Sequence, residues 1–275
     1  MHGLPASEFR VPQLLARGAR AVIGVVHLPP LPGAPGWDGD FAALLDRARA
    51  DLLALVEGGV DAVIVENFGD APFRADAVEA ETIAAMSRVV TELRPLTALP
   101  LGVNVLRNDA AAALAIAAIC AGPDSFIRVN VHSGAMLTDQ GLITGRADRT
   151  IRRRRELGVS VAILADVLVK HAVPLGPLTI EDAARDAVER GFADALIVTG
   201  VGTGHATDLA DVRRVRAALP DTPILVGSGV DEHNVRDTFA LADGAIIGTA
   251  FKFGGKTTNP VEVARVRRLV AAAKG

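Results

Sequence analysis

Two stretches near the C-terminus decide the fold: Pro223-Ile-Leu-Val-Gly-Ser-Gly229 and, fifteen residues later, Gly244-Ala-Ile-Ile-Gly-Thr-Ala-Phe251. Each is a short apolar run that stops at glycine with serine or threonine. In a barrel of eight strand–helix units, the loops after the last two strands commonly form a phosphate site. Glycine permits close backbone approach, and free N–H groups supply the hydrogen bonds that a phosphate needs. The two stretches therefore predict an enzyme-like barrel whose ligand carries a phosphate.

The rest of the chain repeats one unit, a short apolar strand followed by a turn and an amphipathic helix. The apolar runs are continuous rather than alternating, which is typical of parallel strands covered on both faces. The expected strands are residues 21–28, 62–67, 101–106, 126–131, 161–167, 195–200, 224–229 and 245–251. Eight such units predict an α/β fold, the (β/α)8 TIM barrel, with an open doubly wound sheet as the alternative. We expect residues 1–275 to form a single barrel domain, with residues 1–20 as an N-terminal lead-in segment.

Composition narrows the class of protein. Half of the 275 residues are hydrophobic and the net charge is −3, which suits one domain with a large core and provides no basic field for nucleic acid. The four arginines at 152–155 span a full helical turn, so most of them should face solvent. No signal peptide or membrane-spanning stretch is evident. We expect a cytoplasmic protein that does not bind nucleic acid and does not insert into a membrane, and we also expect a homo-oligomer.

Polar side chains end several of the expected strands. In a barrel, the C-terminal ends of the strands share one mouth, where catalytic groups gather. A carboxylate buried there without partners would be costly, so the pattern indicates function, although each residue alone could cap the following helix. The residues are His27, Glu66, Asn67, Asn104, Asn130, His132, Asp166 and Thr199.

Asp166 is the first candidate for acid–base catalysis. It follows an apolar strand and precedes Lys170, and a carboxylate in apolar surroundings suits proton transfer near neutral pH. Its alternative role is to organise the loop to Lys170. Glu66 lies across the mouth as the natural second carboxylate, so that the two would divide the acid and base roles. A magnesium ion between them is a minority interpretation, because no dense metal-ligand motif occurs, and the chemistry requires no other cofactor.

Amides and histidines complete the predicted set. Asn104 and Asn130 lie between valines near strand ends, where an amide can hold sugar hydroxyls, a carbonyl or neighbouring barrel residues. His27 and His132 open loops and could shuttle protons near neutral pH, although a single loop histidine is more often a plain hydrogen-bonding residue. The predicted catalytic residues are Asp166, Glu66, His132, His27 and Lys170, and the predicted substrate-binding residues are Asn104, Asn130, Arg128 and Thr199.

Three glycine-rich loops define the predicted phosphate site. The segment Thr199-Gly-Val-Gly-Thr-Gly204 lacks the glycine spacing of a dinucleotide fingerprint but should lie beside the two opening stretches. Tight turns without a ligand would use the same glycines. The predicted phosphate-binding residues are Gly202, Gly204, Gly227, Ser228, Gly229, Gly248, Thr249 and Lys252. Residues 132–146 form the longest non-repetitive stretch and are expected to act as a lid over the mouth.

At these motifs the chain resembles the BtpA/SgcQ family over nearly its whole length. The similar segments are residues 24–35, 65–70, 101–109, 128–134, 138–143, 164–167, 226–230 and 247–252. The resemblance implies a barrel of the ribulose-phosphate-binding type. The family name is tied to photosystem I biogenesis, whereas related members in non-photosynthetic bacteria accompany sugar-use genes.

Three functions remain open. The first is an enzyme that acts on a small phosphorylated sugar or nucleotide-derived metabolite by acid–base chemistry, as an isomerase, epimerase or lyase. The second is cleavage or transfer at a ribosyl or glycosyl C1, which would use both carboxylates. The third is a non-catalytic assembly factor for a photosystem or membrane complex, as the family name suggests, and this function predicts an exposed apolar patch.

Overall fold

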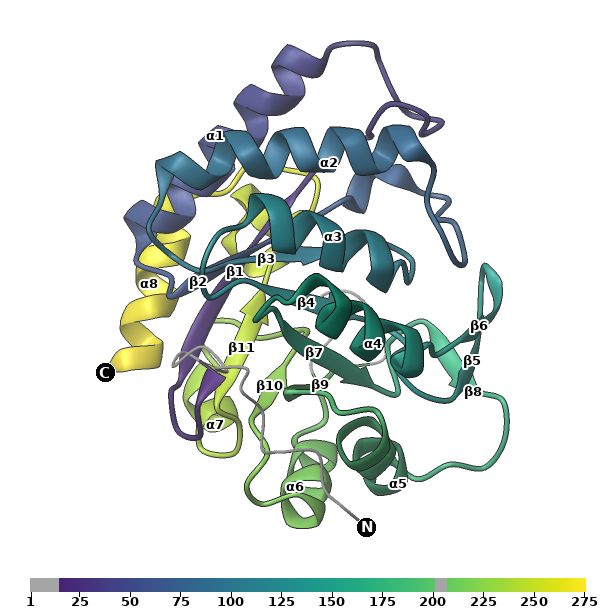
Figure 1. Cartoon of the computed structure of the whole chain (residues 1–275). Helices are drawn as coiled ribbons and strands as arrows, with labels where there is room; N and C mark the ends of the chain where they lie inside the picture. The colour runs from purple at the N-terminus through teal and green to yellow at the C-terminus, as the bar shows by residue number, and fades with distance from the viewer. Residues whose placement is uncertain (1–14, 201–206) are drawn as a thin grey trace.

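Eight parallel strands close into a barrel with helices around its outside (Figure 1). The computed structural model describes residues 15–200 and 207–275. Around the barrel the strands are β1 (Ala21–His27), β2 (Ala62–Glu66), β3 (Leu101–Asn104), β4 (Phe126–Val129), β7 (Ala162–Val167), β9 (Ala195–Val198), β10 (Ile224–Val226) and β11 (Gly244–Ile247). The predicted (β/α)8 barrel is confirmed.

The helices between the strands form the outer layer. They are α1 (Phe41–Gly58), α2 (Ala80–Leu93), α3 (Ala110–Cys120), α4 (Ala147–Leu157), α5 (Ile180–Arg185), α6 (Leu209–Ala218), α7 (Val235–Phe239) and α8 (Val263–Lys274). Short turns of helix add η2 (Phe68–Asp70), η3 (Arg94–Leu96), η4 (Asp186–Arg190), η5 (Thr249–Phe251) and η6 (Phe253–Gly255). Local signals fix several ends: Asp40 caps α1 through the N–H of Ala43, and Gly59 ends that helix at φ +90°.

The glycine motifs lie beyond the strands rather than inside them. We expected strands to residues 229 and 251, but β10 ends at Val226 and β11 at Ile247. Glycine has no side chain to pack into a strand, so the ladder stops where the glycines begin. The motifs therefore form loops at the mouth. Gly202 and Gly204 lie outside the described residues.

Residues 132–146 contain a β-hairpin that the sequence did not predict. Strands β5 (Ala135–Thr138) and β6 (Gly141–Thr144) pair antiparallel, and β8 (Ala172–Pro174) pairs with β5 on its other side. This three-stranded sheet lies at one side of the barrel in Figure 1. Met136 and Ile143 on one face pack against Val131 and Val169.

The arginine run lies on α4, and three of its four side chains are exposed as expected. The exception is Arg154, which is buried with Nη1 2.5 Å from Oδ2 of Asp194. Among the described residues, no helix combines the length and apolar character needed to cross a bilayer.

Alternate residues of each strand fill the barrel interior, as the two-residue period of a strand requires. Phe126 is the largest interior side chain, and β3 makes room for it with glycine: a Cβ on Gly102 would lie 2.3 Å from Cε2 of Phe126. Leu15 from the lead-in segment joins the same cluster. The other interior residues are Ala21, Ile23, Val25, Ala62, Ile64, Ala162, Leu164, Ala195, Ile197, Leu225 and Ile246.

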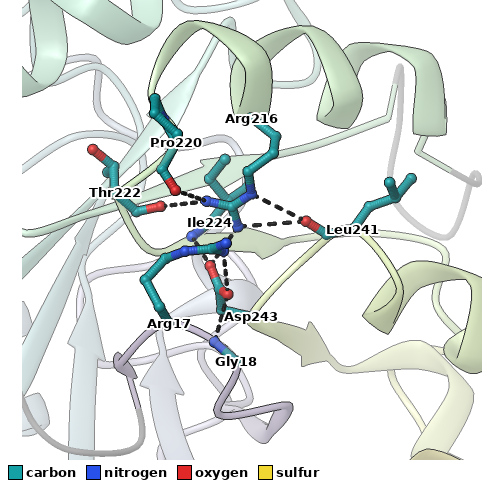
Figure 2. Close-up of polar contacts among 8 residues, drawn as sticks. All are labelled: Arg17, Gly18, Arg216, Pro220, Thr222, Ile224, Leu241 and Asp243. Carbon is teal, nitrogen blue, oxygen red and sulfur yellow. Dashed lines mark hydrogen bonds and ion pairs between the residues drawn. The ribbon is translucent and has the colours of Figure 1, made fainter.

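A single carboxylate, Asp243, ties the N-terminal end of the barrel together (Figure 2). Its Oδ1 accepts hydrogen bonds from Arg17 Nη1 at 2.5 Å and from the Gly18 N–H at 2.7 Å. Its Oδ2 accepts from Arg216 Nη2 at 2.5 Å and from the Ile224 N–H at 2.8 Å. The lead-in segment, α6, β10 and β11 therefore meet at one buried charge. Contacts at this end of a barrel serve stability rather than catalysis.

Replacing Asp243 should destabilise the fold. Burial alone would raise the pKa of Asp243, but the N–H groups of Gly18 and Ile224 and the two arginines outweigh burial and hold it below 3.8. Its stabilisation is therefore complete above pH 3.8 and is lost as the pH falls through the lower folded-state value. Asp243→Asn should reduce the free energy of unfolding by about 3 kcal/mol in urea at pH 7. Asp237→Asn, on the exposed surface of α7, is the matched control, and equal losses would contradict this role.

Candidate active site

At the C-terminal end of the barrel, the next inward-facing position of each strand forms one further layer of residues. We call it the polar layer, because six of its eight members have polar side chains. Seven of its members stand two positions after a residue of the interior cluster, and Asn104 stands two positions after Gly102, which makes room for Phe126. His27, Glu66 and Asn104 are also register partners on β1, β2 and β3. The layer consists of His27, Glu66, Asn104, Arg128, Asp166, Thr199, Gly227 and Gly248. All eight are among the predicted site residues.

Asp166 is held by Arg128 and is not in apolar surroundings, which corrects our expectation. Arg128 Nε donates to Oδ1 at 2.9 Å and Nη2 to Oδ2 at 2.8 Å. Asn130 Nδ2 adds a contact to Oδ2 at 3.3 Å, and the Asp166 side chain is 0% exposed. Burial would lower the pKa of Arg128, but Asp166 raises it, so the guanidinium stays charged. Asp166 therefore positions Arg128 and does not face a ligand.

Glu66 is the carboxylate of this layer that lines a cavity. Its Oε2 accepts from Asn104 Nδ2 at 2.8 Å, and its Oε1 lies 3.8 Å from Nε2 of His27. Asn104 therefore orients Glu66. A magnesium ion shared by Glu66 and Asp166 does not fit, because Arg128 occupies both oxygens of Asp166. In the described part of the chain, no three His, Cys, Asp or Glu side chains are grouped to hold a metal ion.

His27 is a neutral imidazole beside Glu66. Burial, and after it the charges of Lys252, Lys170 and Arg128, hold the pKa of His27 well below 6.5. Its Nδ1 is buried and has no hydrogen-bond partner within residues 15–200 and 207–275. Gly248 leaves room for this ring, since a Cβ there would lie 2.5 Å from Cε1 of His27.

Lys170 lies on a constrained loop after β7. Its N–H donates to Thr199 Oγ1 at 3.1 Å, and its carbonyl accepts from Arg107 Nη2 at 2.7 Å. Thr199 therefore holds the loop, and Arg107 is a residue that the sequence did not predict. Burial, and after it the charge of Arg128, lower the pKa of Lys170 to about 8, against the opposing charge of Glu66.

Two adjoining cavities open at this mouth. The glycine-loop cavity, of about 240 Å³, is lined by residues 227–231 and 246–250 together with His27. The hairpin cavity, of about 520 Å³, is lined by Arg107, Asn130, His171 and Asp139, which lies in the β5–β6 turn. Four residues line both cavities: Glu66, Phe68, Arg128 and Lys170. The expected lid segment thus reaches the mouth at the tip of its hairpin.

The glycine-loop cavity is rich in unused backbone donors. Within the described residues, five of the residues that line it have a backbone N–H group that donates to no acceptor, namely Gly229, Val230, Gly248, Thr249 and Ala250. The loop is fixed by Asn234, whose Nδ2 donates to the Gly229 carbonyl at 2.8 Å, and Gly229 adopts φ +66°. Backbone N–H groups that are free of other acceptors are the donors that bind phosphate oxygens.

The cation beside these loops is Arg265, and the prediction of Lys252 was wrong. The Lys252 side chain is fully buried, with Nζ 2.8 Å from Oδ2 of Asp51 on α1, and lines neither cavity. The chain turns through η5 after β11, which directs Lys252 toward α1. Arg265 on α8 lines the glycine-loop cavity and donates from Nε to the Ala250 carbonyl at 2.7 Å. Nothing in the spacing of α8 distinguished Arg265 from its neighbouring arginines.

His132 is also away from the mouth. It is 1% exposed, its Nε2 donates to the Gly191 carbonyl at 2.8 Å, and it lines neither cavity. Burial lowers its pKa, so the ring is neutral. The predicted catalytic role of His132 is therefore not supported by its position.

Known structures share this fold at low sequence identity. The thiamine phosphate pyrophosphorylase of Pyrococcus furiosus superposes with a TM-score of 0.56 at 14% identity, covering 94% of this chain and 96% of that chain. The phosphoribosyl anthranilate isomerase of Thermococcus kodakaraensis gives 0.54 at 15% identity, covering 93% and 99%. These likenesses establish the barrel fold.

Sequence relatives are much closer. The photosystem I biogenesis protein BtpA of Synechocystis is 47% identical over 91% of this chain and 87% of the relative. SgcQ, a protein of the sgc region of Escherichia coli, is 36% identical over 91% and 93%. The model of the BtpA family matches residues 18–275. The chain therefore belongs to the BtpA family.

Proposed function

We propose that this protein is a cytoplasmic enzyme that binds a small phosphorylated metabolite and reacts it by proton transfer. One observation carries the proposal: a single cavity joins five unused backbone N–H groups and Arg265 to Glu66, His27 and Lys170. The first group of residues suits a phosphate, and the second suits acid–base chemistry. The combined cavities are of the size that holds a small metabolite.

The phosphate would lie against the glycine loops. Arg265 supplies a charge there, while Arg128 and Lys170 add positive charge to the same cavity. The fold neighbours named above carry phosphorylated compounds in their names, which agrees with this assignment, although their likeness concerns only the fold. A carbon chain attached to the phosphate would then reach Glu66 and Lys170.

The reacting end would lie between Glu66 and Lys170. Glu66 is oriented by Asn104 and would remove a proton from carbon. Lys170, with a pKa near 8, and neutral His27 are placed to give or take a second proton. Isomerase, epimerase or lyase chemistry fits this set. Cleavage at a sugar C1 fits less well, because it needs two available carboxylates and Arg128 engages Asp166.

A second candidate is an assembly role, as in the name of the Synechocystis relative. It is favoured by a row of exposed apolar side chains across the small sheet, where Leu137 stands between Leu142 and Val173. Their exposed fractions are 54%, 50% and 64%. Such a row suits a protein contact, including the expected contact with a second copy of this chain. An assembly protein would need no ligand at the mouth.

Phosphate binding should depend on Arg265. A panel of phosphorylated sugars should raise the melting temperature, since a ligand at 100 times its Kd adds about 2.7 kcal/mol of stability. Arg265→Gln should weaken binding about tenfold or more. Arg267→Gln, on the same helix and paired with Glu57 at 2.7 Å, is the matched control. Lys252→Met should lower the melting temperature but leave the affinity unchanged. The absence of any shift across the panel would favour the assembly role.

Proton transfer should depend on Glu66. When the protein is incubated in D₂O with the sugar phosphates that stabilise it, the hydrogen on the carbon next to the carbonyl group of the sugar phosphate should exchange for deuterium. NMR detects this exchange. Glu66→Gln should slow this exchange by about 10²–10⁴-fold, the usual contribution of a general base. Asp148→Asn, exposed on α4, should leave the rate unchanged. Exchange at the wild-type rate in Glu66→Gln would exclude Glu66 as the base.

A further inference from the structure

Lys170 differs from the other lysines of this chain. The sequence has four, of which Lys252 is paired with Asp51, Lys274 is paired with Asp61 at 2.8 Å, and Lys256 is exposed and lines neither cavity. Lys170 is partly buried and forms no ion pair or side-chain hydrogen bond within the described residues, and it lines both cavities. An amine in this position can reach the carbon chain of a ligand whose phosphate lies in the glycine-loop cavity.

We infer that Lys170 is a nucleophile that forms an imine with an aldehyde or ketone carbon of the phosphorylated substrate. The inference rests on the proposed function and deepens it, because it restricts the substrate to a carbonyl compound. Arg265 and the backbone donors already serve the phosphate, so the amine is not needed there.

The backbone around Lys170 is held in a conformation that is unusual for residues other than glycine. Leu168 and His171 adopt φ +48° and +57°, which are costly for residues other than glycine. Arg107 and Thr199 bind the Lys170 carbonyl and N–H and hold this conformation. Strained backbone maintained by its surroundings is a common feature of functional sites.

The charges around Lys170 favour the reactive neutral amine. Burial has the largest effect, Arg128 and Arg107 add to it, and Glu66 and Asp166 oppose it, which gives a pKa of about 8. About a tenth of the amine is then neutral at pH 7, roughly two hundred times the fraction of an ordinary lysine. Desolvation of this kind activates a lysine for imine formation.

Groups at the site account for every proton transfer in this reaction. The neutral amine adds to the carbonyl carbon, forming the C–N bond, and one proton moves from nitrogen to oxygen. A second proton, which Glu66 takes from the ammonium form of Lys170 before the attack, lets the oxygen leave as water, and the nitrogen lone pair completes the protonated C=N bond. Glu66, now a carboxylate, can then remove a proton from the neighbouring carbon, whose electrons move toward the imine. Addition of water reverses the first steps and releases the product.

Reductive trapping tests this inference on the full-length protein. Dihydroxyacetone phosphate and sodium borohydride should yield a secondary amine on Lys170, found by peptide mass spectrometry at more than about tenfold excess over Lys256 and Lys274. The initial trapping rate should rise about tenfold from pH 7 to 9 and then level off, whereas an ordinary lysine would keep gaining up to pH 10 and beyond. Lys170→Arg keeps the positive charge and should give no adduct at this position.

Binding of sn-glycerol 3-phosphate, which has a phosphate but no carbonyl, separates this inference from the proposed function. If it stabilises the wild type and Lys170→Arg while dihydroxyacetone phosphate gives no adduct on Lys170, the imine is excluded and the phosphate site stands. If Lys170 is trapped but sn-glycerol 3-phosphate does not bind, the nucleophile stands and the phosphate site fails. Equal labelling of Lys170, Lys256 and Lys274 would also overturn the inference.

Discussion

The closed barrel forces alternate side chains of eight strands into one shared space, and the polar layer of the site follows from this constraint. Toward the N-terminal end of the strands, this space is filled by apolar side chains around Phe126. At the C-terminal end of the strands, the same alternation brings charged groups together. Each of them needs an oppositely charged or hydrogen-bonding partner, or a cavity that a ligand can occupy. Arg128 and Asp166 satisfy each other almost completely. Glu66 is left facing the cavities, where Lys170 joins it from the loop after β7, and these two are the groups to which we assign chemistry.

The two ends of the barrel divide stability from function. At the N-terminal end, Asp243 binds four donors from three segments and faces no cavity among those described (Figure 2). At the C-terminal end, five N–H groups lack acceptors in the described residues, and Lys170 lacks a charge partner there. A fold tolerates such unsatisfied groups where a ligand completes them. The mouth is therefore the part of the molecule arranged for binding.

The sequence predicted the barrel and all members of its polar layer. Both rest on local signals, namely the polar residues at the ends of apolar strands and the glycines at which two apolar runs stop. It could not predict how these residues pair. Asp166 looked isolated in an apolar run, yet its partner Arg128 lies one strand away and 38 positions earlier in the chain. Lys252 looked close to the glycine loop, but one helical turn directs it to Asp51. Arg265 and Arg107 reach the mouth from elements whose sequences carry no sign of it, and the hairpin strands are too short to show their alternation.

A crystal structure with bound inorganic phosphate tests the central claim most directly. We predict phosphate density in the glycine-loop cavity, with oxygens within hydrogen-bond distance of the N–H groups of Gly229 and Gly248 and near Arg265. Density found instead only at the arginine-lined groove on α4, around Arg146 and Arg149, would contradict the account. So would an empty glycine-loop cavity at phosphate concentrations that saturate related phosphate sites.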